Sequence, residues 1–194
     1  MKKLGFLVCV FLIVAFTNKG ATFKNTMVVI APESLVVVNG TTNVNTFKCM
    51  YDAGKFKNPI PVFYHLEDGK MIFNKTVLVL DSNGFDCGGN AINNDFKKIL
   101  KADSYPKITL FLKQIDDVTN ETNINASVDL EIAGVKKPFK TPVHISNNNG
   151  FSVKGKINIS LKDFNLEAPK KFLGLIVVND KIDIDFKLVV KEQN

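Results

Sequence analysis

The chain has 194 residues and a formal net charge of +6, with 25 Lys and Arg residues against 19 Asp and Glu residues. The lysines are spread along the chain and form no cluster, which argues against a nucleic-acid-binding protein. The only histidines, His65 and His144, stand in no metal-ligand spacing, which argues against a zinc site.

Residues 1–20 have the pattern of a signal peptide. Two lysines precede an apolar segment, residues 4–16, that is too short to span a membrane. We expect cleavage between Ala15 and Ala21, which leaves residues 21–194 as a single domain in the periplasm or outside the cell.

The first half of the mature chain alternates between apolar strands and turns. Strands are predicted at residues 26–30, 34–38, 44–51 and 71–80. Ala31-Pro32 breaks the first two strands apart, and the Asn39-Gly40 dipeptide predicts a turn. Residues 52–61 are polar and contain three Gly or Pro residues, so they predict a loop.

One short helix is expected at residues 91–100, after a glycine-rich corner. Phe96, Ile99 and Leu100 would lie on one face of this helix, one turn apart. Tyr105-Pro106 is expected to end it, because the residue before a proline is pushed out of the helical region. A strand at residues 108–113 follows. Since nearly everything else reads as strand, we expect this helix to close or support a sheet.

The second half predicts long antiparallel strands at residues 127–133, 137–145, 151–161 and 182–188. Their apolar and polar residues alternate strictly, so one face is expected to be buried and the other solvated. The whole pattern predicts an all-β fold, a single antiparallel barrel of about eight strands with one short helix. A barrel of this size is just wide enough to be filled or to hold one slim ligand.

Two cysteines, Cys49 and Cys87, remain after signal removal. An even pair in an exported chain suggests a disulfide, which would attach the glycine-rich corner to an early strand. Two free buried thiols are the alternative.

No residue stands out as catalytic. Asp183 and Asp185 form a pair on one strand face, but Lys181 and Lys187 share that face, so a solvated and charge-compensated strand is favoured. The chain contains no Gly-x-Ser-x-Gly motif. We therefore expect a protein that is not an enzyme.

Four segments in the same order resemble the YceI-like family: the helix, Tyr-Pro and strand of residues 94–108, the hairpin LEIAGVKKPF at 130–139, ISLKDFNL at 159–166, and the closing strand at 178–188. The resemblance implies a lipocalin-like barrel in the periplasm, with an apolar channel for an amphiphilic small molecule such as a polyisoprenoid or a quinone. The chain departs from the family pattern at two places. Residues 34–45 contain no histidine, and Asn165 stands where the family has glycine.

On this basis the ligand would lie inside the barrel, with the helix near Phe96 and the segment 169–174 covering the mouth. The predicted ligand-binding residues are Phe96, Ile99, Leu100, Ile108, Leu110, Leu130, Phe139, Phe151, Val153, Ile157 and Phe186. No metal and no cofactor beyond a bound isoprenoid or fatty-acyl ligand is expected, nor is nucleic acid or stable membrane insertion. The alternative function is a filled barrel that acts as an exported interaction or stress-associated module.

Overall fold

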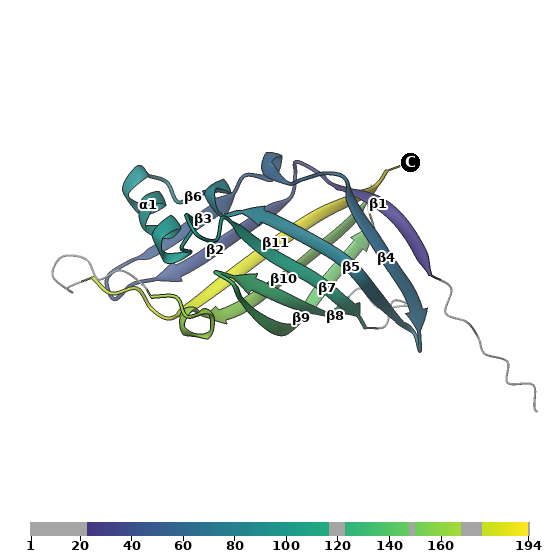
Figure 1. The fold of residues 1–194 in the computed structure, drawn as a ribbon. Helices are drawn as coiled ribbons and strands as arrows, with labels where there is room; N and C mark the ends of the chain where they lie inside the picture. Colours follow the sequence, from purple (N-terminus) through teal and green to yellow (C-terminus); the bar gives the residue numbers. More distant parts are fainter. Residues whose placement is uncertain (1–22, 117–122, 148–149, 168–175, 194) are drawn as a thin grey trace, which may run out of the picture.

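A computed structural model describes residues 23–116, 123–147, 150–167 and 176–193. In these residues eleven strands form one antiparallel sheet, accompanied by a single α-helix (Figure 1). The elements are β1 (Lys24–Ile30), β2 (Leu35–Thr41), β3 (Thr46–Tyr51), β4 (Ile60–Glu67), β5 (Lys70–Asp81), β6 (Phe85–Asp86), α1 (Asn90–Ile99), β7 (Lys107–Ile115), β8 (Asn123–Ile132), β9 (Val135–Asn147), β10 (Phe151–Ser160) and β11 (Lys181–Glu192).

Eight of these strands close into a barrel. Their order is β1-β4-β5-β7-β8-β9-β10-β11, and β11 pairs back onto β1 to complete the ring. β2, β3 and β6 continue the sheet from β11 beyond the ring. The prediction of an antiparallel barrel of about eight strands with one short helix is confirmed.

The ring is completed where β1 and β2 meet, around Pro32. β1 pairs with the last residues of β11 and β2 with its first half. Between them, the Ala31 amide donates to the carbonyl oxygen of Val189 at 2.8 Å, and the Val189 amide donates to Oγ of buried Ser34 at 2.9 Å. The serine hydroxyl thus takes the place of a backbone acceptor where the strand is interrupted.

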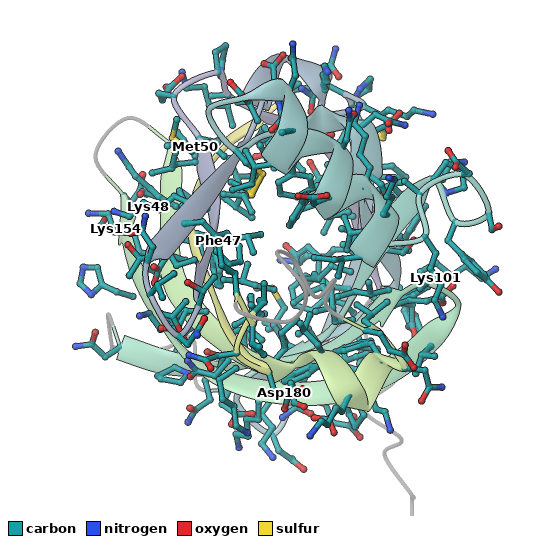
Figure 2. All side chains as sticks on the ribbon, turned by 90° about the vertical axis from the view of Figure 1, so that its left-hand side faces the viewer. Phe47, Lys48, Met50, Lys101, Lys154 and Asp180 are labelled. Carbon is teal, nitrogen blue, oxygen red and sulfur yellow. A yellow bond between two sulfur atoms is a disulfide. The ribbon has the colours of Figure 1, made fainter. Side chains whose placement is uncertain are left out.

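Helix α1 confirms the predicted helix and lies beside β3 and β6 at one end of the barrel (Figure 1). It ends at Ile99, with Lys101 in the left-handed region at φ +53°, and so stops before Tyr105-Pro106 rather than at it. Figure 2 views the barrel from the end that carries this helix. None of the helices in the described part of the chain is long and apolar enough to cross a membrane.

Two local predictions were wrong. Asn39-Gly40 lies within β2 rather than in a turn, because Gly40 faces Phe47 on β3 and a Cβ there would stand 2.2 Å from the phenylalanine ring. The predicted loop at residues 52–61 ends two residues too late, because β4 begins at Ile60 and pairs with β1 through both Ile60 and Pro61.

The predicted disulfide is present between Cys49 on β3 and Cys87, which follows β6. The two Cα atoms are 4.0 Å apart, and Cys49 is fully buried. The bond closes a sequence separation of 38 residues and holds the corner that leads into α1 against β3.

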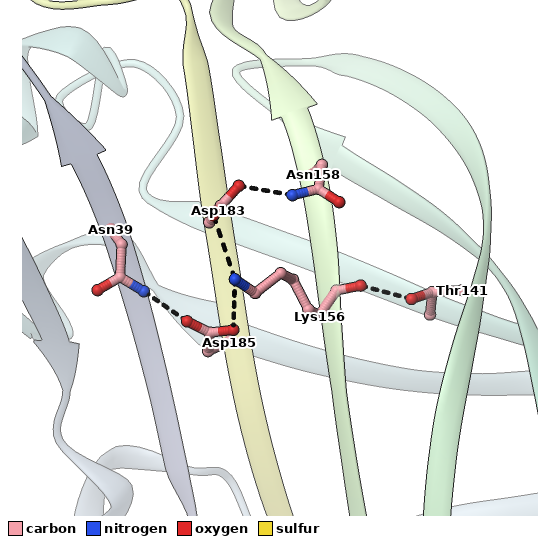
Figure 3. A network of polar contacts seen from close by, with 6 residues as sticks. All are labelled: Asn39, Thr141, Lys156, Asn158, Asp183 and Asp185. Carbon is pink, nitrogen blue, oxygen red and sulfur yellow. Dashed lines mark hydrogen bonds and ion pairs between the residues drawn. The ribbon is translucent and has the colours of Figure 1, made fainter. Parts of the chain in front are cut away.

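A polar network on the outer surface links β2, β11 and β10 (Figure 3). Nζ of Lys156 lies 3.2 Å from a carboxylate oxygen of Asp183 and 3.4 Å from one of Asp185. Asn158 donates to Asp183, and Asn39 donates to Asp185. The two carboxylates therefore share one ammonium group on the neighbouring strand, as a charge-compensated strand face and not as an acid/base pair.

Reduction of the Cys49–Cys87 bond should destabilise the barrel. Closing a loop of this length contributes about 4 kcal/mol on the chain-entropy model, so a reductant should lower the melting temperature by about 10 °C in a chain of this size. The measurement is thermal unfolding by circular dichroism with and without reductant, with the Cys49→Ala/Cys87→Ala variant as the control that should not respond. An unchanged melting temperature in the parent protein would contradict the structural role of the bond.

The surface network should make stability depend on acid pH. Hydrogen bonds from Asn158 and then from Lys156 lower the pKa of Asp183 below its ordinary value of 3.8. The stabilisation is therefore present above about pH 4 and is lost as the pH falls through the lowered pKa.

Urea unfolding between about pH 5 and pH 2 should show a shallower loss of stability for Asp183→Asn than for the parent protein. Asp103→Asn, which removes an exposed carboxylate outside the network, should follow the parent curve. Identical pH profiles for the parent and Asp183→Asn would exclude this contribution.

Candidate functional site

The interior of the barrel is hollow. A cavity of about 720 Å³ lies between the inward faces of the strands, within the range of small-molecule sites in proteins. At about 30 Å³ for each water-sized group, this volume would hold on the order of twenty such groups. It is therefore large enough for one slender chain.

Of the ligand-binding residues predicted from the sequence, all except Phe139 line this cavity. They are Phe96, Ile99, Leu100, Ile108, Leu110, Leu130, Phe151, Val153, Ile157 and Phe186. Strand alternation and the helical repeat together brought these side chains to one common surface. Their part in binding a ligand stays a prediction.

Phe139 has a different position. Its ring stacks on Phe164, with ring centroids 6.2 Å apart and planes at 11°. Phe164 is completely buried, and neither ring belongs to the cavity wall. Phe139 therefore packs in the core around the turn after β10.

The sequence-based prediction missed the part of the wall that β1 and β4 supply. Ile60, Val62, Tyr64 and Leu66 of β4 all face the cavity. Their alternation with outward residues is visible in the sequence. Pro59 and Pro61 obscured this signal, because prolines are usually read as loop residues.

Close packing against glycine keeps a large ring from blocking the cavity. Phe186 on β11 lies opposite Gly155 on β10, and a Cβ at Gly155 would stand 2.5 Å from the Phe186 ring. The missing side chain thus lets the ring lie close to the strand. Phe47 uses Gly40 in the same way, and Figure 2 shows Phe47 at the end of the barrel near α1.

Helix α1 contributes to the wall at this end through Phe96, Ile99 and Leu100. Phe96 packs against Phe85 of β6, with ring centroids 5.2 Å apart. Phe85 in turn contacts Tyr51, which lies two residues after Cys49 of the disulfide. Burial of the Tyr51 phenol raises its pKa. The aromatic cluster and the disulfide hold the helix in place beside the cavity.

The cavity reaches solvent at the opposite end. Among the lining residues that the structure describes, the exposed ones are Lys24, Leu66, Phe151 and Glu192. They come from β1, β4, β10 and β11, which are consecutive around the barrel in the order β4-β1-β11-β10. We call these four residues the mouth. It lies at the end away from α1. The expectation that the helix and residues 169–174 cover a mouth stays a prediction, because residues 169–174 fall outside the described residues.

The cavity wall is almost entirely apolar. Cys49 and Cys87 do not line it and are joined to each other in the disulfide. Within the described residues, no group of three or more His, Cys, Asp and Glu side chains is placed to hold a metal ion. What the site does offer is a long apolar surface.

Comparison with known proteins identifies the fold family. The YceI-like domain model matches residues 37–190. BcnA from Burkholderia cenocepacia has a similar crystal structure, with a TM-score of 0.66 and 21% identity over 84% of this chain and 99% of that chain. A polyisoprenoid binding domain from Saccharophagus degradans gives a TM-score of 0.60 and 14% identity over 89% of this chain and 100% of its own. The YceI protein of Campylobacter jejuni gives a TM-score of 0.53 and 16% identity, over 100% of this chain and 99% of its own.

No curated protein sequence matches the chain. The similarity to the solved structures is low in sequence and shows the fold alone. The family model covers most of the described residues, including the helix, the long second-half strands and the closing strand. The chain therefore belongs to the YceI-like family.

Proposed function

We propose that this protein is an exported carrier that holds one apolar chain, of isoprenoid or fatty-acyl type, inside its barrel. The observation that carries the proposal is the cavity of about 720 Å³, walled almost entirely by apolar side chains. Membership of the YceI-like family supports the same ligand class, as does the structural similarity to a protein described as a polyisoprenoid binding domain. A filled-barrel interaction module is not favoured, because it requires a solid interior.

Burial of the tail supplies the affinity in this proposal. Each methylene moved from water into an apolar site gains about 0.8 kcal/mol. A chain of about ten methylenes would gain roughly 8 kcal/mol before the entropic cost of binding is subtracted. Such a ligand needs few polar contacts inside the barrel. Thr76 and Thr141, two hydroxyl groups in the wall, are already bonded to the backbone at Phe63 and Lys156.

Filling the cavity should abolish binding without unfolding the barrel. Ala126 is a small, buried wall residue on β8, so Ala126→Trp would place a ring in the space meant for the ligand. Its neighbour Asn125 is exposed, and Asn125→Trp is the matched control. Titration with a fluorescent fatty acid and displacement by geranylgeraniol should show at least tenfold weaker binding for Ala126→Trp only.

The control variant also distinguishes a specific effect from damage to the fold. Both variants should keep the strand signal of the parent protein in circular dichroism. Equal affinities of Ala126→Trp and the parent would mean that the ligand binds outside the barrel, and the carrier proposal would fail.

Export is the second part of the proposal, and the signal-like segment at residues 1–20 supports it. Protein recovered from the exporting host should have lost its first residues, with a new N-terminus between Ala15 and Ala21. Intact-mass measurement checks this directly. A chain recovered at full mass from the cytoplasmic fraction would contradict export.

A further inference from the structure

The cavity wall contains few polar groups, and most of them already have partners. The polar lining residues are Lys24, Thr26, Tyr64, Thr76, Thr141 and Glu192. The two deep threonines bond to backbone groups, as noted above, and Thr26 donates to the Glu192 carboxylate at 2.5 Å. This leaves Lys24 and Tyr64, whose ammonium and hydroxyl groups have no hydrogen bond or ion pair with any other residue that the structure describes.

These two residues are direct neighbours. Lys24 on β1 pairs with Tyr64 on β4, and both side chains face the cavity. Residues paired in this way have Cβ atoms about 5 Å apart, so the ammonium and the phenol can reach one small group together. The Tyr64 ring rests against Phe73, with centroids 6.1 Å apart, which supports the ring from the side of β5.

The pair stands where the apolar wall ends. Lys24 is exposed and Tyr64 is half-buried. Farther into the barrel along the same two strands, Val28 and Val62 continue the apolar wall. A chain lying in the barrel with its head at the mouth would bring that head to Lys24 and Tyr64. A charged head would remain partly hydrated there and avoid the cost of full burial.

Glu192 is the acidic residue among the four that form the mouth, so it could compete with a ligand for the ammonium group of Lys24. It lies on β11, on the other side of β1 from Tyr64, and accepts the hydrogen bond of Thr26. It forms no ion pair with Lys24 within the described residues. The ammonium of Lys24 thus stays available to a ligand.

We propose that Lys24 and Tyr64 bind the anionic head of the ligand, a carboxylate or a phosphate ester, while its tail fills the barrel. This inference rests on the proposed carrier function and narrows its ligand to an anionic amphiphile. An ammonium and a hydroxyl that both donate to one oxyanion form charge-assisted hydrogen bonds, which are stronger than bonds between neutral groups.

The test compares ligands that share a tail and differ only in the head. Oleate is compared with oleyl alcohol, and geranylgeranyl phosphate with geranylgeraniol, by displacement of a fluorescent probe at neutral pH. The parent protein should bind at least one anion about tenfold more tightly than its alcohol, as expected for hydrogen bonds to a charged group. Whichever anion shows the larger preference identifies the head as carboxylate or phosphate.

Variants then assign this preference to the two residues. Lys24→Gln should bring the anion-to-alcohol ratio close to one while alcohol binding stays unchanged, and Tyr64→Phe should reduce the ratio by a smaller factor. Lys154→Gln, which removes an exposed lysine on β10 that does not line the cavity, should keep the parent ratio. Glu192→Gln should keep or increase the preference for the anion, because it removes the competing charge.

The outcomes separate this inference from the proposed function. If parent and Lys24→Gln bind anions and alcohols equally well, or if Lys24→Gln loses both equally, the head-group assignment is wrong and a neutral ligand is indicated. If the parent binds none of the four ligands, the carrier function itself fails.

Discussion

The barrel depends on β11, whose single edge bonds to both β1 and β2. Without the pairing of Val28–Ile30 with the end of β11, the sheet would be open and its inner face exposed. Pro32 interrupts the edge, and the hydroxyl of Ser34 supplies the acceptor that the Val189 amide would otherwise lack. A buried amide without a partner costs about 1–3 kcal/mol. Closure thus turns one apolar sheet face into the inner wall of a cavity.

Once the ring is closed, the size of the side chains decides whether it is hollow. The side chains of an eight-stranded barrel can fill its interior completely. In this barrel they leave a cavity of about 720 Å³. Phe186 lies close to the wall because Gly155 opposite has no side chain, and Ala126 adds little volume. Among the described residues, the polar groups deep in this wall are the hydroxyls of Thr76 and Thr141, and both are hydrogen-bonded to the backbone. The proposed ligand, with its apolar tail inside and its polar head at the Lys24 end, matches this distribution of polar groups.

Local pattern explains which parts of this structure could be predicted from the sequence. Strict alternation located the long strands of the second half and the part of the wall that they supply, and the helical repeat placed Phe96 correctly. Phe139 was expected in the wall because it alternates correctly, but its contact with Phe164 depends on how a distant turn folds back. The mouth was not predicted either. Lys24 and Tyr64 meet only through the register of β1 and β4, which the sequence pattern does not specify.

Ligand carriage is tested most directly by native mass spectrometry of the protein purified from the host that produces it, followed by solvent extraction. We expect a co-purifying mass in the isoprenoid or fatty-acyl range, bound at one molecule per chain and released by organic solvent. A mass equal to the polypeptide alone in repeated preparations, with no uptake of offered polyprenols or fatty acids, would contradict a carrier function.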